Sequence, residues 1–301
     1  MKIIFMVTPD FAVPSLDVLL KSRHDVVAVV TGPDKERGRG QKLTYTPVKE
    51  FAVKNNVPVL QPDRLKDEAF ISELKKYNAD LFIIVAFRIL PREVFVLPAK
   101  GSYNLHGSLL PKYRGAAPIQ WALINGEKET GVTTFKLEEK VDTGNIILQE
   151  KVKIDDEDDF GILHDKLSLI GADVIKKTIE LIEKDNIVLQ KQDDSLASPA
   201  PKITKELCEI SWHKPADAVH NLIRGLSPYP GAFFKYDDKI IKIFKTKVSS
   251  SNILQPGEIK HDKKNLYIGC LTDSLEILEL QLEGKKRLQA EEFLRGFNFD
   301  K

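Results

Sequence analysis

The chain of 301 residues is long enough for two average domains, and its 42% hydrophobic and 30% charged residues exclude an intrinsically disordered protein. Lysine and arginine number 45 against 44 aspartates and glutamates, and the resulting net charge of +1 excludes a protein that coats nucleic acid through bulk charge. Two cysteines, far apart and without metal-ligand spacing, argue against a disulfide scaffold and a structural zinc site.

The apolar runs are short throughout the chain. The N-terminal run stops at Thr8-Pro9-Asp10, too early for a signal peptide, and the run from Leu81 to Phe87 is too short to cross a bilayer. These features predict a soluble cytoplasmic protein with no membrane partner.

The first half alternates β-rich runs with helical patterns, which is typical of an α/β fold with a doubly wound, Rossmann-like, mostly parallel sheet. The predicted strands and helices are, in order, Lys2–Val7, Phe11–Lys21 (helix), Asp25–Thr31, Pro47–Lys54 (helix), Phe70–Lys76 (helix), Asp80–Phe87, Ser102–Leu105 and Gly131–Phe135.

A long amphipathic helix is predicted between about Phe160 and Lys184, and the composition changes after it. The polar stretch Lys191–Ile203 carries two prolines, as linkers do. A further helix and four short β-like runs then predict a small β-barrel or sandwich: Ala216–Arg224 (helix), Ala232–Tyr236, Ile240–Val248, Leu266–Leu271 and Leu275–Leu282. We therefore expect a catalytic domain at 1–190, a linker at 191–207 and a C-terminal domain at 208–301.

A nucleotide-binding motif is absent from the first strand-to-helix turn, where it should be strongest. Val7 to Phe11 contains neither GxGxxG nor a phosphate-cradling P-loop.

The sequence from Gly101 to Ile147 carries the candidate chemistry. Asn104 and His106 stand two apart at a strand end, so both side chains project from one face. An amide donor beside an imidazole can hold a developing oxyanion and move a proton. Asp142, in the turn Asp142-Thr143-Gly144, supplies a carboxylate that could meet His106. Each motif alone is more often structural than catalytic.

Together, NLHGSLLPKYRGAAPIQWALINGE, the later TGVT and DTG resemble the signature of the folate-dependent formyltransferases over nearly the whole chain. The resemblance implies Asn104, His106 and Asp142 as the catalytic trio and 10-formyltetrahydrofolate as co-substrate, with no metal. It implies folate contacts from two segments, namely Ser108, Leu109, Leu110 and Pro111, and Phe87, Arg88, Ile89 and Leu90.

The loop between Pro33 and Lys49 holds five basic residues against two acids. It resembles an insertion by which family members that act on initiator tRNA reach its acceptor end, and it implies tRNA contacts from Arg37, Arg39 and Lys42. Gly38 and Gly40 predict a flexible loop. The segment from Trp212 to Phe233 resembles the start of the OB-like C-terminal barrel of the same members.

The resemblance therefore implies transfer of the formyl group to the α-amino group of methionine on initiator Met-tRNA, by a monomer. The sequence departs from the family pattern at two positions, where Val7 replaces a glycine and Phe87-Arg88 replaces Tyr-Gly. Three alternatives stay open. The closest is a sugar-nucleotide formyltransferase of the amino-arabinose type, and the others are a formyltetrahydrofolate hydrolase and a non-catalytic RNA-binding module.

Overall fold

A computed structural model describes residues 1–37, 42–251 and 254–299, with the backbone alone at 35–37, 42 and 43. The described chain divides into two compact units. Unit 1 comprises residues 1–115, 130–153 and 164–199, and unit 2 comprises residues 116–129, 154–163 and 200–301. Two segments that lie within the predicted catalytic domain at 1–190 therefore cluster with the C-terminal unit.

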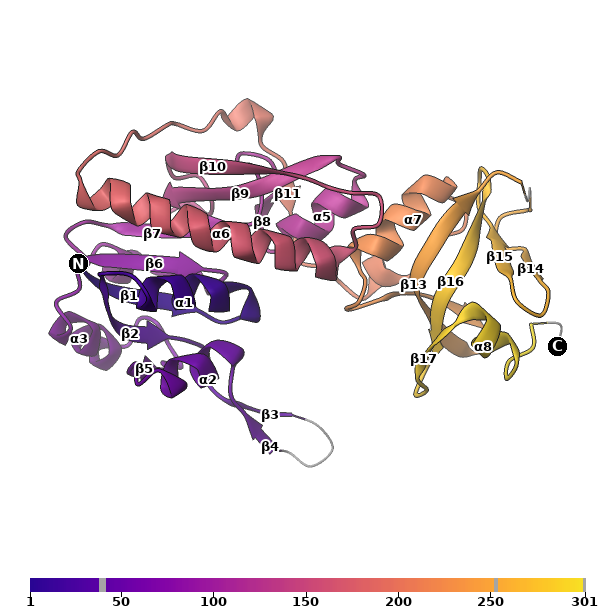
Figure 1. Cartoon of the computed structure of the whole chain (residues 1–301), viewed down its shortest axis with the longest axis horizontal. Helices are drawn as coiled ribbons and strands as arrows, with labels where there is room; N and C mark the ends of the chain where they lie inside the picture. The colour runs from indigo at the N-terminus through magenta and orange to yellow at the C-terminus, as the bar shows by residue number, and fades with distance from the viewer. Residues whose placement is uncertain (38–41, 252–253, 300–301) are drawn as a thin grey trace. The chain divides into compact units, whose positions relative to one another are not determined.

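Unit 1 is built on a seven-stranded sheet (Figure 1). Its strands follow the spatial order β10 (Ile146–Lys153), β9 (Glu129–Lys136), β7 (Ser102–His106), β6 (Leu81–Val85), β1 (Lys2–Val7), β2 (Asp25–Val30) and β5 (Val59–Leu60). The pairs from β7 to β5 are parallel, and β9 runs antiparallel to β7. The predicted mostly parallel sheet is confirmed.

Helices cover both faces of this sheet, which makes it doubly wound. Figure 1 shows α1 (Val13–Leu20) and α6 (Phe160–Glu183) on the face toward the viewer. On the other face, Ile4 and Met6 of β1 and Phe82 and Ile84 of β6 share an apolar cluster with α3 (Glu68–Lys76) and α4 (Arg92–Phe95). The even-numbered side chains of these strands thus pack against one helix layer, because side chains alternate along a strand. Helix α2 (Pro47–Lys54) begins at a Thr46 cap whose hydroxyl accepts from the Lys49 amide.

Several predicted boundaries differ from the observed ones, and two of them differ for clear local reasons. A 3-10 turn, Asp10–Ala12, precedes α1, so the helix starts at Val13 with Pro14 in its first turn, where the missing N–H costs nothing. Strand β6 ends at Val85 because Ala86 takes a φ of 47°, in the left-handed region. Val7 ends β1 fully buried and outside that region, so valine fits where the family pattern has glycine.

The basic loop contains a hairpin that the sequence analysis did not predict. Strands β3 (Lys35–Arg37) and β4 (Lys42–Thr44) pair antiparallel, with Lys35 opposite Thr44 and Arg37 opposite Lys42. Two short strands lie elsewhere at the ends of loops, β8 (Arg114–Gly115) and β11 (Pro199–Ala200).

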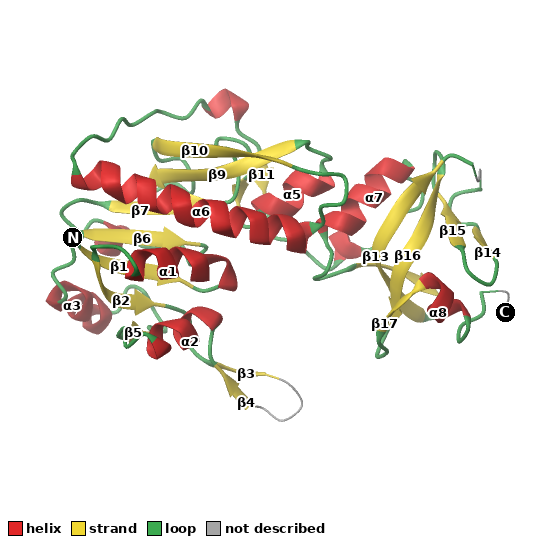
Figure 2. Ribbon diagram, viewed as in Figure 1, coloured by secondary structure: helices red, strands yellow, loops and turns green. Residues whose placement is uncertain are grey.

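Unit 2 carries a six-stranded antiparallel sheet that curls around its own core (Figure 2). Its elements are α5 (Pro118–Ile124), α7 (Ala216–Gly225), β12 (Ala232–Tyr236), β13 (Lys239–Ser249), β14 (Ile259–His261), β15 (Leu266–Gly269), β16 (Ser274–Leu282), β17 (Arg287–Gln289) and α8 (Ala290–Leu294). Ile223 of α7 and Ile241 and Ile277 of the sheet are among its fully buried core. The β12–β13 turn places Asp237 and Asp238 at positive φ, as tight hairpin turns require. The predicted barrel-like C-terminal domain is confirmed as a half-barrel.

Candidate active site

The end of β7 presents Asn104 and His106 on one face of the sheet. Leu105, which lies between them, is adjacent to Val85 of β6 and opposite Thr134 of β9, so its side chain points the other way. The carboxyl ends of the parallel strands meet at this edge, where open α/β sheets bind their ligands. His106 is buried, whereas Asn104 is half-buried and its side chain makes no hydrogen bond within the described residues.

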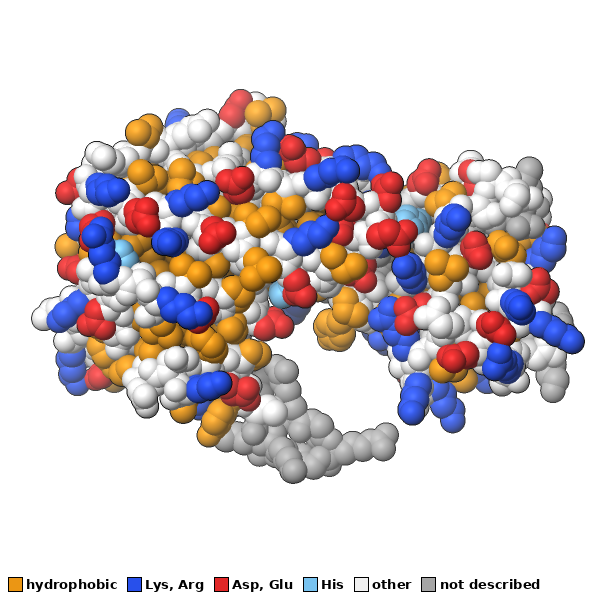
Figure 3. Space-filling model, viewed as in Figure 1, with side chains coloured by type: hydrophobic (Ala, Val, Ile, Leu, Met, Phe, Trp, Pro, Cys, Tyr) orange, Lys and Arg blue, Asp and Glu red, His pale blue; other side chains and the backbone are white. Residues whose placement is uncertain are grey.

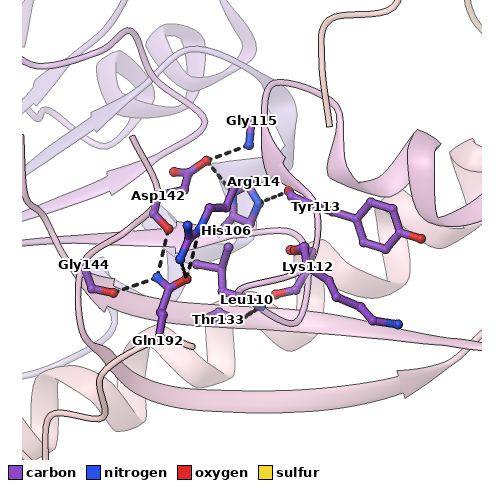
Figure 4. A network of polar contacts seen from close by, with 11 residues as sticks. His106, Leu110, Lys112, Tyr113, Arg114, Gly115, Thr133, Asp142, Gly144 and Gln192 are labelled. Carbon is purple, nitrogen blue, oxygen red and sulfur yellow. Dashed lines mark hydrogen bonds and ion pairs between the residues drawn. The ribbon is translucent and has the colours of Figure 1, made fainter. Parts of the chain in front are cut away.

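One protein contact fixes the tautomer of His106. Its Nε2 lies 2.8 Å from the carbonyl oxygen of Tyr113 (Figure 4). A carbonyl only accepts, so Nε2 carries the proton and donates it. In the neutral ring Nδ1 is then unprotonated, and this atom lies 3.7 Å from Oδ2 of Asp142. The pair is close, but too far apart for a direct hydrogen bond.

Asp142 and Tyr113 both hold strained backbones. Their φ angles are 55° and 62°, and left-handed conformations of non-glycine residues cluster at functional sites. The Tyr113 turn directs its carbonyl at His106, and the Asp142 turn brings a nearly buried carboxylate to the same ring. Oδ2 of Asp142 also accepts from the Gly115 amide at 2.8 Å.

Gln192 and Arg114 complete the polar network, and sequence reasoning assigned neither of them to it. Gln192 comes from the stretch expected to be a linker, is 6% exposed, and reaches the backbone of the Asp142–Gly144 turn. Arg114 donates to it twice. A polar residue in a polar, proline-containing stretch gives no signal of burial, so sequence alone could not have identified Gln192.

The predicted folate segment Ser108–Pro111 is held by hydrogen bonds to Lys112 and Thr133. The Ser108 hydroxyl donates to the Lys112 carbonyl at 2.6 Å, and the Leu110 amide donates to the Thr133 hydroxyl at 3.1 Å. The Leu110 side chain is buried in a cluster with Phe135 and Ile146. Leu109 and Pro111 stay half-buried, so any contact of this segment with a ligand falls mainly to them.

The second predicted folate segment, Phe87–Leu90, follows β6 and therefore lies at the same edge of the sheet. Ile89 is 75% exposed, whereas Leu90 is buried in the core. The Arg88 guanidinium turns back onto the loop after β5, donating to the carbonyls of Pro62 at 2.8 Å and Asp63 at 2.9 Å. Arg88 is thus tied to the protein rather than extended into solvent.

The predicted tRNA contacts belong to the β3–β4 hairpin. Arg37 and Lys42 pair across it through their backbones, while Arg39 lies outside the described residues. Next to the hairpin, Lys49 forms an ion pair with Asp34 and donates to Gln61 at 2.7 Å. The hydrogen bonds from Lys49 and then Gln61 hold the pKa of Asp34 below its usual value.

Within the described ranges, no group of three or more His, Cys, Asp and Glu side chains could hold a metal ion. No helix of that part of the chain is long and apolar enough to span a membrane.

Residues 1–179 match the family described as formyl transferase, and residues 202–298 match its C-terminal domain. These matches define an enzyme of one class: the chain belongs to the formyl transferase family. Within it, the chain is 46% identical over 301 residues to a methionyl-tRNA formyltransferase of Caldanaerobacter subterraneus subsp. tengcongensis, covering 99% of this chain and 97% of that protein. A methionyl-tRNA formyltransferase of Flavobacterium johnsoniae is 47% identical over 305 residues, with the same coverage.

Solved structures share the fold at lower identity. An N-formyltransferase from Helicobacter canadensis, in complex with folinic acid and dTDP-3-aminofucose, is 22% identical with a TM-score of 0.68, covering 96% of this chain and 100% of that one. A methionyl-tRNA formyltransferase from Clostridium thermocellum is 19% identical with a TM-score of 0.57, covering 84% and 95%. At these identities the likeness extends to the fold alone.

Proposed function

We propose that the protein transfers the formyl group of 10-formyltetrahydrofolate to the α-amino group of methionine on initiator Met-tRNA, as a cytoplasmic monomer. The observation that carries this proposal is the His106–Asp142 pair, 3.7 Å apart beside Asn104 at the carboxyl edge of the sheet. Its support in sequence is the 46% identity to a methionyl-tRNA formyltransferase over 99% of the chain.

The tautomer of His106 suits the proton transfer that the reaction needs. When the methionine amine attacks the formyl carbon, the nitrogen must lose a proton, and the unprotonated Nδ1 can accept it. The carboxylate of Asp142 then stabilises the imidazolium. The same proton passes to N10 of the folate as its bond to the formyl carbon breaks, which restores the neutral ring.

Asn104 can stabilise the negative charge of the tetrahedral intermediate by hydrogen bonding. Negative charge develops on the formyl oxygen in the tetrahedral intermediate, and the Asn104 amide is free within the described residues to donate to it. Nε2 of His106 already donates to the Tyr113 carbonyl. His106 can therefore donate to the formyl oxygen only from Nδ1, once Nδ1 is protonated.

The folate would lie along the edge formed by the segments after β6 and β7. Both segments follow adjacent parallel strands, with Val85 beside Leu105. An exposed apolar side chain, Ile89, and the half-buried Leu109 and Pro111 offer the apolar surface that a pterin ring requires.

A sugar-nucleotide formyltransferase remains the alternative, because proteins of that kind share the fold. The basic hairpin favours the tRNA substrate, since a small sugar nucleotide has no need of a projecting basic arm. Sequence identity to the methionyl-tRNA formyltransferases of Caldanaerobacter subterraneus and Flavobacterium johnsoniae, 46% and 47%, is also about twice the 22% identity to the N-formyltransferase with bound sugar nucleotide.

The deciding experiment offers initiator Met-tRNA and amino-sugar nucleotides as acceptors, with 10-formyltetrahydrofolate as donor. We expect formylation of Met-tRNA alone.

Asn104→Ala, His106→Ala and Asp142→Asn should each lower kcat by about 10²–10³-fold, the usual cost of losing one such group. His24→Ala, a histidine just before β2 at the opposite edge of the sheet, is the matched control. Near wild-type rates in all three site variants, with donor binding intact, would rule out this assignment of the trio.

A further inference from the structure

We propose that Gln192 is a positioning residue, which holds the Asp142–Gly144 turn so that the Asp142 carboxylate faces His106. The inference rests on the proposed function, because it gives Gln192 its role through Asp142. It assigns a catalytic consequence to a residue of the predicted linker.

Both the NH₂ group and the oxygen of the Gln192 side-chain amide form hydrogen bonds in this network (Figure 4). Nε2 donates to the carbonyl of Asp142 at 2.9 Å and to the carbonyl of Gly144 at 2.8 Å. Oε1 accepts from Arg114, from Nε at 3.1 Å and from Nη2 at 2.7 Å. Both donor hydrogens and both acceptor lone pairs are therefore engaged, and at 6% exposure water has little access to replace them.

The turn that Gln192 holds has little freedom on its other side. A Cβ placed on Gly144 would lie 1.7 Å from the carbonyl oxygen of Lys136, so the turn packs directly against the end of β9. Asp142 itself keeps a φ of 55°, in the left-handed region that aspartate adopts more readily than most L-residues. The two bonds from Gln192 to the carbonyls of Asp142 and Gly144 hold the turn in this conformation.

Arg114 and its neighbour Gly115 link Gln192 to the carboxylate of Asp142. Its neighbour Gly115 donates its amide to Oδ2 of Asp142 at 2.8 Å, while the Arg114 guanidinium holds Gln192 and reaches Asp194 at 2.7 Å. Asp142 is thus held by its carbonyl through Gln192 and by its carboxylate through Gly115. Loss of Gln192 would free the backbone of Asp142 to turn and so weaken the bond between its carboxylate and the Gly115 amide.

The test compares two substitutions at this position. Gln192→Met keeps the volume and removes all four hydrogen bonds. Gln192→Glu keeps acceptors for Arg114 but places a carboxylate against two carbonyls in place of their donor. Ser195→Ala, on an exposed residue of the same segment, is the control. We expect both Gln192 variants to lose about 10–10²-fold in kcat, with KM for donor and Met-tRNA within about threefold, because displacement of a catalytic group by about 1 Å has a cost of this size.

Amide hydrogen exchange gives a readout that does not depend on the substrate. Exchange of the Gly115 amide should accelerate in both Gln192 variants and not in Ser195→Ala. An active wild type with unchanged kcat in Gln192→Met, or in Gln192→Glu where Gln192→Met does not fold, would overturn the inference. Absence of Met-tRNA formylation by the wild type would instead refute the proposed function, while the exchange comparison would still decide whether Gln192 holds the turn.

Discussion

A single hydroxyl organises the segment that the sequence assigns to folate contact. Thr133 is fully buried on β9, and its Oγ1 donates to the Ser108 carbonyl at 2.6 Å. The same oxygen accepts from the Leu110 amide at 3.1 Å and from Gln149 Nε2 at 2.9 Å. A hydroxyl has one donor and two acceptor sites, and all three are used here.

Thr133→Val should therefore lower the free energy of unfolding by about 1–3 kcal/mol, the cost of leaving buried polar groups without partners. The loosened segment should also raise KM for the folate donor. Urea titration and donor kinetics measure the two effects. Thr130→Val is the matched control on the same strand, because the Thr130 hydroxyl is buried without a partner among the described residues. Equal destabilisation by the two substitutions would contradict this account.

Arg88 shows how a departure from the family pattern is accommodated. Its two bonds to the carbonyls of Pro62 and Asp63 tie the loop after β5 to the loop after β6. Lysine keeps the charge but cannot donate from a rigid fork to both carbonyls. For Arg88→Lys we expect KM for the folate donor to rise by about three- to tenfold with kcat unchanged, the signature of lost uniform binding. A lower kcat at constant KM would show that Arg88 acts on the chemical step.

At the scale of the elements, local sequence patterns correctly predicted strands and the direction of their side chains. The almost continuous apolar run of β6 indicated a strand covered on both faces, and the spacing of Asn104 and His106 placed them on one side of β7. What escaped prediction depends on contacts between distant segments. Gln192 lies 50 residues from Asp142 in the chain, and the left-handed φ of Tyr113 is a conformation that its residue type disfavours.

The β3–β4 hairpin changes the expectation for the basic loop. Cross-strand pairing opposes Arg37 to Lys42, and the ion pair of Lys49 with Asp34 accounts for one basic and one acidic residue near its base. The remaining charge of the segment is concentrated between Lys35 and Lys42. The backbone pairing of these strands distinguishes the described part of the segment from an irregular loop.

The combined variant Arg37→Ala, Arg39→Ala, Lys42→Ala should raise KM for Met-tRNA and flatten its dependence on salt, because each lost phosphate contact reduces the slope of log affinity against log salt by roughly 0.7–0.9. The folate KM should not change. Lys21→Ala, Lys75→Ala, Lys76→Ala removes the same charge from exposed residues of unit 1, one at the C-cap of α1 and two in α3, and serves as the control. Unchanged tRNA kinetics in the hairpin variant would exclude the hairpin from tRNA binding.

At the scale of the whole molecule, the near-zero net charge is distributed unevenly along the chain. The segment from Pro33 to Lys49 carries +3, and residues 201–301, with 17 basic and 14 acidic side chains, carry another +3. The rest of the chain is acidic enough to bring the total to +1. Figure 3 shows basic and acidic side chains interspersed over the visible face of both units. This face offers no extended positive field to a generic polyanion.

This distribution predicts strong discrimination between nucleic acids. Non-specific binding to duplex DNA depends on counterion release from many neutralised phosphates, and typical dissociation constants are about 10⁻⁴–10⁻⁶ M at physiological salt. A chain with interspersed charge should bind random duplex DNA at the weak end of that range, while Met-tRNA binds more tightly through a local basic site. Fluorescence anisotropy with labelled duplex DNA and Met-tRNA at matched ionic strength measures both. Equal affinities would mean that bulk charge, rather than a local site, governs the encounter with RNA.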